Sequence, residues 1–321
     1  MSTAKSVTAI PVSQYDGVVR GRAFGALVET TKPGITRLVA FTTFVGYALV
    51  ALAGGPLTTD VLLAAGGCAL GTAFCAAGAN SLNMWMEVAR DRRMPRTADR
   101  PLPKQRLELV SVLRWGVGLV VVGVAALAIG FGPAPALLAL LSAALYLFAY
   151  TPLKLVTPWC TVVGAVPGAL PTLIGAAAAS TSFGFGSWLE PVGLALFGLL
   201  AVWQLPHFFA LAWMYRDDYA AGGMKMLTVV DPTGRRAREA SVAGALLFIP
   251  ASIAPAWTSP LLGPVYVAIA TAAGLAFLCL TVRLWRTPTD AAAKVVFFAS
   301  IIHLPVLLTA MASEAAIRSL F

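Results

Sequence analysis

Apolar runs long enough to cross a bilayer recur along most of the chain, separated by short polar connections. An α-helix rises about 1.5 Å per residue, so roughly 20 apolar residues cross a hydrocarbon core about 30 Å thick. The fourth run is short and the sixth carries Gln204, Pro206 and His207, which leaves eight helices as an alternative. The pattern predicts an all-α polytopic membrane protein whose nine helices lie near residues 34–54, 61–86, 109–130, 135–151, 159–179, 191–213, 241–258, 262–282 and 293–313.

The polar connections are too short to fold into a soluble domain. We therefore predict an N-terminal tail over residues 1–30, a single transmembrane domain over residues 31–316 and a short C-terminal tail over residues 317–321. The composition agrees, because 59% of the residues are hydrophobic and only 12% are charged, against about 25% charged in soluble domains.

Basic residues gather at one end of the predicted helices. With nine helices, 22 of the 23 Lys and Arg residues lie in the tail or at even-numbered connections, and only Arg318 lies elsewhere. Because Lys and Arg near helix ends stay on the cytoplasmic side, the N-terminus is predicted to be cytoplasmic and the C-terminus periplasmic. The net charge of +9 suits the lipid bilayer and anionic substrates. We expect no nucleic-acid partner, because no soluble scaffold presents that charge.

The cysteines and the N-terminal segment bear on the cellular compartment. Four cysteines lack the paired spacing of a metal site and lie in or near apolar runs. Residues 1–30 lack the apolar core of a secretory signal, and Asp16 with three basic residues is untypical of a mitochondrial transit peptide. These features favour a bacterial inner membrane over the mitochondrial inner membrane.

Three side chains with oxygen atoms follow the second apolar run. Asn83, Glu87 and Asp91 are spaced four apart, so they share one helix face, with about 6 Å between neighbours and about 12 Å between the ends. Adjacent pairs could help hold Mg²⁺, which prefers oxygen ligands and bridges substrate phosphates. The alternative is a set of surface ion pairs with nearby arginines.

A second acidic pair, Asp217 and Asp218, follows the sixth predicted helix. The predicted topology places it at the same end of the bundle as the first group. Two acidic groups there could clamp cations around one diphosphate. The alternative is an ordinary interfacial helix end, in which Arg216 and Lys225 balance the two acids.

Four basic side chains accompany these acids. Arg96 and Arg100 follow the first group, Lys225 follows the second, and Lys154 lies between the fourth and fifth predicted helices. Arginine guanidinium groups suit phosphate oxygens, which makes Arg96 and Arg100 candidate diphosphate contacts. Lys154 could be an anchor that reaches the membrane surface.

Several motifs carry a family resemblance. They are Asn83-x3-Glu87-x3-Asp91-x2-Met94-x-Arg96-Thr97-x2-Arg100-Pro101-Leu102, Tyr150-Thr151-Pro152-Leu153-Lys154, Gly164-Ala165-Val166-Pro167-Gly168-Ala169, and Leu205-Pro206-His207-Phe208 followed by Arg216-Asp217-Asp218-Tyr219. Together they resemble the protoheme IX farnesyltransferases, or heme O synthases, a branch of the UbiA-type intramembrane prenyltransferases. The wider superfamily shares the two acidic groups, whereas Met94-x-Arg96-Thr97 and the Leu205–Phe208 block indicate the heme branch.

The resemblance implies a fold, a reaction and residue roles. A bundle around a central cavity open to the cytoplasm would transfer farnesyl from farnesyl diphosphate to the vinyl group of heme b and add water, giving heme O. The Mg²⁺ shell would consist of Asn83, Glu87, Asp91, Asp217 and Asp218. The diphosphate contacts would be Arg96, Arg100, Lys154 and Lys225. Tyr150 would face the allylic cation, or pack as an ordinary tyrosine.

Two histidines and two other functions complete the expectations. His207 and His303 lie within or beside apolar runs, where either could ligate heme iron or form a structural hydrogen bond. A related enzyme acting on a quinone-precursor or chlorophyll-type acceptor is one alternative. A polytopic secondary transporter is another, although transporter sites tend toward the bilayer midplane, away from helix ends. A heme A synthase or a terminal-oxidase assembly protein would be a candidate partner.

Overall fold

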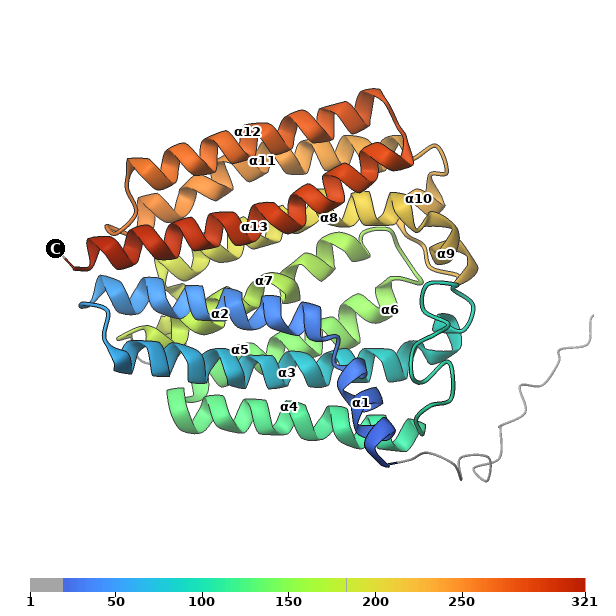
Figure 1. Cartoon of the computed structure of the whole chain (residues 1–321), viewed down its shortest axis with the longest axis horizontal. Coiled ribbons are helices and arrows are strands. Elements are labelled where there is room, and N and C mark those ends of the chain that lie inside the picture. Colours follow the sequence, from blue (N-terminus) through green and yellow to red (C-terminus); the bar gives the residue numbers. More distant parts are fainter. Residues whose placement is uncertain (1–19, 183, 321) are drawn as a thin grey trace, which may run out of the picture.

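The computed structural model describes residues 20–182 and 184–320, which form a single bundle of helices (Figure 1). The elements, in chain order, are α1 (Arg20–Thr30), α2 (Pro33–Ala53), α3 (Thr59–Asp91), α4 (Leu109–Phe131), α5 (Pro133–Ala144), the π-helix η2 (Leu145–Tyr150), α6 (Thr151–Leu153), α7 (Cys160–Ala179), the 3₁₀-helix η3 (Gly184–Leu189), α8 (Pro191–Met214), α9 (Arg216–Ala221), α10 (Leu227–Val230), α11 (Arg235–Thr258), α12 (Pro264–Arg286) and α13 (Asp290–Arg318).

Nine helical segments in this part of the chain are long and apolar enough to cross a membrane. One of them is the continuous stretch Pro133–Leu153, which joins α5, η2 and α6. The nine-helix prediction is therefore confirmed. The main differences lie at the helix ends, because α3 continues to Asp91 and α11 begins at Arg235 instead of residue 241.

Helix α1 lies within the segment that the sequence analysis assigned to the tail. Its Ala26 packs with buried Met84 and Leu102. Glu29 pairs with Arg106 at 2.8 Å. These contacts attach α1 to α3 and to the α3–α4 connection. The first 19 residues of the predicted tail lie outside the described residues.

The polar end of the bundle is defined by the connections 92–108, 154–159 and 215–234. Figure 1 shows the α3–α4 connection, α9 and α10 at this end, and the C-terminus at the opposite end. The predicted sorting of these connections to one end is therefore confirmed. That this end faces the cytoplasm stays a prediction.

Two apolar cores hold the bundle together. One joins α2 and α8 with α11, α12 and α13, and the other joins α3, α4, α5 and α7. Far from the polar end, the backbones of α2 and α7 are in direct contact. A Cβ at Gly46 would collide with the Thr172 carbonyl, and a Cβ at Gly175 would collide with the Thr43 carbonyl. Nearer the polar end, both helices instead border a cavity.

Candidate active site

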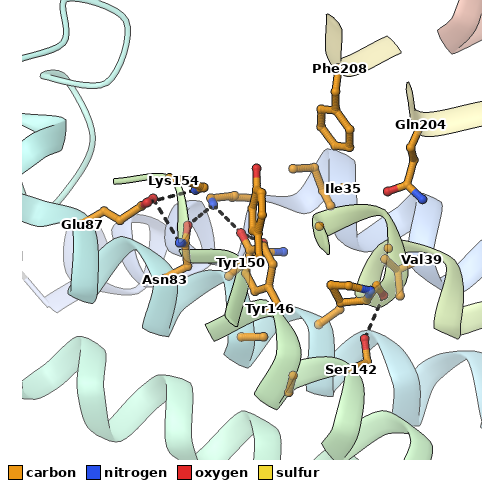
Figure 2. Close-up of a pocket in the computed structure, with 18 of the residues that line it drawn as sticks. Ile35, Val39, Asn83, Glu87, Ser142, Tyr146, Tyr150, Lys154, Gln204 and Phe208 are labelled. Atoms are coloured by element: carbon orange, nitrogen blue, oxygen red, sulfur yellow. Dashed lines mark hydrogen bonds and ion pairs between the residues drawn. The ribbon is translucent and has the colours of Figure 1, made fainter. Parts of the chain in front are cut away.

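The cavity has a volume of about 290 Å³ and lies between α2, α3, α5, α7 and α8. Charged and hydroxyl groups line it at the polar end, whereas Ala76, Ala139 and Ile174 line its deep part. Figure 2 shows Asn83, Glu87 and Lys154 together on one side, with Gln204 and Phe208 across from them. Such a shape suits a molecule with an anionic head and an apolar body.

Asn83, Glu87 and Asp91 all line the cavity from the last turns of α3, as their spacing predicts. All three are buried, with exposed fractions of 1%, 4% and 0%. A buried carboxylate is costly unless it is paired, so its partners define the electrostatics of the site.

Each carboxylate has a cation as its partner. Glu87 Oε1 accepts a hydrogen bond from Lys154 Nζ at 2.9 Å, and Glu87 Oε2 accepts one from Asn83 Nδ2 at 3.0 Å. The two oxygens of Asp91 accept from one guanidinium nitrogen of Arg100 at 3.0 and 2.8 Å. The polar end therefore holds alternating positive and negative groups within contact distance.

Lys154 is positioned by a π-helical segment. Its ammonium lies 4.5 Å from the ring centroid of Tyr150, and that ring stacks on Tyr146 with centroids 5.7 Å apart. Both tyrosines belong to η2, whose wider turn is of a kind often found at functional sites. Burial alone would lower the pKa of Lys154, but the adjacent Glu87 carboxylate raises it above its ordinary value.

Gly164 on α7 leaves room for the Tyr150 ring. A Cβ at this position would lie 2.6 Å from a carbon of that ring. This distance is far inside van der Waals contact, so any side chain here would displace the tyrosine. The glycine thus explains why α7 can approach the aromatic wall of the cavity.

Lys32 is a cavity residue that the sequence analysis did not single out. It has left-handed backbone angles, φ 51° and ψ 68°, and its ammonium donates to Asn83 Oδ1 at 2.9 Å and to the Tyr146 hydroxyl at 3.3 Å. Burial, together with the positive charges of Arg100 and Lys154, lowers its pKa to about 7. The only local signal was a lysine placed directly before Pro33 at the start of an apolar run.

The second acidic pair lies at the rim and does not line the cavity. Asp218 Oδ1 is 3.5 Å from the backbone N–H of Arg96, which links α9 to the α3–α4 connection. The Arg96 guanidinium itself lies 4.6 Å above the Tyr215 ring. Asp217 is exposed. The two acidic groups therefore share one end of the bundle, with only Asp218 next to the first group's connection.

Lys225 lies outside the cavity, and its contact with diphosphate stays a prediction. Its side chain is exposed and does not line the cavity, whereas its backbone N–H donates to the Lys154 carbonyl at 2.6 Å. The structure therefore gives Lys225 a backbone contact that supports the Lys154 turn. The predicted site residues that do line the cavity are Asn83, Glu87, Asp91, Arg96, Arg100, Tyr150 and Lys154.

The side chains at the polar end fit a magnesium ion in part. No three His, Cys, Asp or Glu side chains among the described residues come close enough to hold a metal by themselves. Magnesium, however, is commonly held by one or two carboxylates together with water and substrate phosphates. Glu87, Asp91 and the amide oxygen of Asn83 supply such hard oxygen donors. Of the predicted five-residue shell, these three line the cavity and Asp218 lies at its rim, and the shell itself stays a prediction.

Neither histidine lines the cavity. His207 Nδ1 is hydrogen-bonded to Ser300 Oγ at 2.7 Å, and its ring stacks between Trp203 and Phe297. His303 packs edge-on against two phenylalanine rings, at 4.9 and 5.2 Å. Both rings are packed between α8, α13 and their neighbours, outside this cavity. That either histidine ligates heme iron stays a prediction.

Comparison with known proteins identifies the family. Residues 39–302 match the UbiA prenyltransferase family. The chain is 38% identical over 284 residues to the protoheme IX farnesyltransferase of Solibacter usitatus, covering 87% of this chain and 95% of that protein. The chain belongs to the protoheme IX farnesyltransferase branch of the UbiA prenyltransferase family. It is therefore a membrane prenyltransferase.

Other relatives of this prenyltransferase agree in sequence and in fold. It is 41% identical over 277 residues to the protoheme IX farnesyltransferase of Salinibacter ruber, covering 85% of this chain and 93% of that protein. A solved UbiA homologue from Archaeoglobus fulgidus, bound to DMAPP and Mg²⁺, has the same fold with a TM-score of 0.59 at 14% identity, covering 88% of this chain and 98% of the other.

Proposed function

We propose that this prenyltransferase moves a farnesyl group from farnesyl diphosphate to the vinyl group of heme b, with addition of water, giving heme O. The observation that carries the proposal is a cavity with buried, paired charges at one end and an apolar interior at the other. The names of the relatives support heme as the acceptor and farnesyl as the donor.

The diphosphate would bind at the polar end, where Arg96, Arg100, Lys154 and Lys32 all line the cavity. Charge-assisted hydrogen bonds from these groups would hold its oxygens. When diphosphate binds, Lys154 and Arg100 would exchange part of their hydrogen bonding to Glu87 and Asp91 for hydrogen bonds to phosphate oxygens. The freed carboxylate oxygens could then hold Mg²⁺.

When bound, Mg²⁺ stabilises the negative charge that develops on the leaving diphosphate. The bond between C1 of the farnesyl group and the diphosphate oxygen breaks, and its electron pair stays on that oxygen. The terminal vinyl carbon of heme b then bonds to C1. Water adds to the resulting carbocation and a proton is lost, so diphosphate and heme O are the products.

The protein would guide this reaction by orientation and by exclusion of water. The cations at the polar end are fixed before ionisation, so they stabilise the leaving oxygens without reorganising. The Tyr150 ring faces the same region. Once Lys154 contacts the diphosphate, the ring face that it covers becomes available to the allylic cation. Ala76, Ala139 and Ile174 would keep water away from the chain.

We place the enzyme in a bacterial inner membrane, with its polar end and N-terminus in the cytoplasm. The sorting of basic residues to that end supports this orientation, and bacterial relatives support the compartment. Association with a heme A synthase or a terminal-oxidase assembly protein stays a prediction, which co-purification from membranes would test.

The proposal is tested with purified protein in lipid nanodiscs, supplied with Mg²⁺, heme b and labelled farnesyl diphosphate. We expect mass spectrometry to detect labelled heme O, and EDTA to abolish it until Mg²⁺ is restored. Asp91→Ala should abolish product formation because it removes a buried cavity carboxylate. Asp99→Ala is the matched control, because Asp99 is an exposed acid on the connection that directly follows Asp91.

A panel of acceptors separates the proposal from its nearest alternative. Transfer of the label to a hydroxybenzoate-type quinone precursor, with none to heme b, would show that the acceptor is wrong although the donor site is right. Unchanged turnover in Asp91→Ala would refute the assignment of the diphosphate site itself.

A further inference from the structure

We propose that Gln204 holds and orients the water molecule that adds to the heme vinyl group after the farnesyl group has been transferred. Gln204 lies on α8 and lines the cavity, with an exposed fraction of only 5%. The inference rests on the proposed function, because only an acceptor that is hydrated after prenyl transfer requires such a water. It gives a task to a side chain outside the charged end of the cavity.

The side-chain amide of Gln204 has a fixed orientation. Its Nε2 donates to the Ala165 carbonyl at 3.1 Å and to the Leu200 carbonyl at 3.0 Å. An amide nitrogen carries two N–H donors, so both are used, and the reverse orientation would set the amide oxygen against two carbonyl oxygens. The oxygen Oε1 therefore points away from these carbonyls, and Figure 2 shows it directed into the cavity.

Gly168 on α7 makes room for this amide. A Cβ at Gly168 would overlap Oε1 of Gln204 and would lie 2.9 Å from its Cδ. Gly168 also lines the cavity, together with Pro167 and Pro171 of the same helix. Because glycine has no side chain, the amide can rest on the α7 backbone, and any larger residue at this position would displace it.

The amide oxygen of Gln204 is available to a ligand. Among the described residues, the hydrogen bonds of this amide are all made by Nε2, and no donor is bonded to Oε1. Two hydroxyl side chains of the same cavity, Thr72 and Ser142, instead donate to the carbonyls of Cys68 and Pro167, both at 2.9 Å. A buried acceptor without a partner is costly, so this oxygen is suited to bind a small donor such as water.

The position of Gln204 suits the second step of the reaction. Figure 2 shows Gln204 across the cavity from Asn83, Glu87 and Lys154. The diphosphate would leave on that charged side, so a water at Gln204 stands apart from the bond that breaks. One cavity can thus keep water from the allylic cation and still supply water to the cation that forms on the acceptor.

The hydration step balances without any further reactant. Once the terminal vinyl carbon has bonded to C1 of the farnesyl group, the positive charge lies on the vinyl carbon next to the porphyrin ring. A lone pair of the water oxygen forms the new C–O bond, and one O–H bond of that water breaks. An amide oxygen is too weak a base to keep the proton, which passes to the diphosphate released in the same reaction.

Without a held water, the same cation has another outcome. It loses a proton from the adjacent carbon, and a double bond forms in place of the C–O bond. The product is an alkene that is lighter than heme O by one molecule of water. The ratio of this alkene to heme O therefore reports how well water is positioned, whereas the sum of the two products reports prenyl transfer.

The test measures both products by mass spectrometry, with protein in lipid nanodiscs supplied with Mg²⁺, heme b and labelled farnesyl diphosphate. Gln204→Met removes the acceptor oxygen and keeps the length of the side chain. We expect the alkene-to-heme O ratio to rise about tenfold, because one hydrogen bond lost from the hydration step changes its rate by about that factor. Gln204→Glu keeps an oxygen at this place and should retain the original ratio.

Two further variants make the test specific. Gly168→Ala should raise the ratio as Gln204→Met does, because its Cβ would displace the same oxygen. Gln105→Met is the matched control, since Gln105 is an exposed glutamine on the α3–α4 connection. The ratio is taken within each sample, so a smaller folded fraction of one variant does not change it.

An unchanged ratio in Gln204→Met, with label still transferred to heme b, would overturn this inference and leave the proposed function intact. An equal rise in Gln105→Met, or a rise in Gln204→Glu as large as in Gln204→Met, would overturn it as well. If the unchanged protein transfers no label to heme b at all, the proposed function fails, and the role of Gln204 in hydration fails with it.

Discussion

The buried pair between Lys154 and Glu87 gives the sharpest prediction about stability. The two charged atoms are 2.9 Å apart, and the side chains are only 11% and 5% exposed. With an effective dielectric constant of about 20, Coulomb attraction at that distance is about 6 kcal/mol. Desolvation of both groups opposes most of it. Removing only the lysine, however, leaves the carboxylate buried without its cation.

We expect Lys154→Met to lower the free energy of unfolding by about 3 kcal/mol, the cost of breaking one side of a buried ion pair. Glu87→Gln added to Lys154→Met should recover most of this loss, because no charge is then left unpaired. Unfolding in mixed detergent micelles, followed by tryptophan fluorescence, measures both changes. The same samples should show weaker displacement of labelled farnesyl diphosphate by inorganic diphosphate.

Lys104→Met is the matched control. Lys104 pairs with Asp99 at 2.6 Å, but the two side chains are 54% and 78% exposed. A pair so accessible to water contributes little, and we expect no measurable change in stability. If both lysine variants behave alike, or if the double variant is as unstable as Lys154→Met alone, the reasoning from burial is refuted.

Two further predictions concern the geometry of the cavity. Gly164→Ala should lower the rate of a single turnover by up to about a hundredfold, since its Cβ would push the Tyr150 ring out of place; a normal rate in rapid-quench measurements would contradict this. Asp218→Ala should weaken Mg²⁺-dependent binding of farnesyl diphosphate because Asp218 anchors the Arg96 connection, whereas exposed Asp217→Ala should leave it unchanged; equal losses in titrations of both variants would argue against the rim assignment.

Much of the architecture was readable from the amino-acid sequence. Each transmembrane helix satisfies its own backbone hydrogen bonds, so length and hydropathy alone locate it in a bilayer. The common helix face of Asn83, Glu87 and Asp91 followed in the same way, because four-residue spacing is a local property of a helix. The family motifs added the reaction class, which the comparisons with relatives confirm.

Contacts between distant segments had to come from the tertiary structure. Lys32 contacts Asn83 although 51 residues separate them, and it lies in the left-handed turn between α1 and α2. Asp217 and Asp218 are neighbours in sequence, yet only Asp218 lies against the Arg96 connection. No periodicity in the sequence indicates either contact, because both depend on how separate helices pack.

The depth of the cavity has the same origin. Apolar periodicity marks Ala76, Ala139 and Ile174 as interior residues without saying whether they face a core or an open space. That choice depends on the close approach of α2 and α7 at Gly46 and Gly175, and on how the apolar cluster of α3, α4, α5 and α7 packs. The sequence by itself thus determined which segments cross the membrane, whereas the packing of side chains between helices determined where the cavity lies.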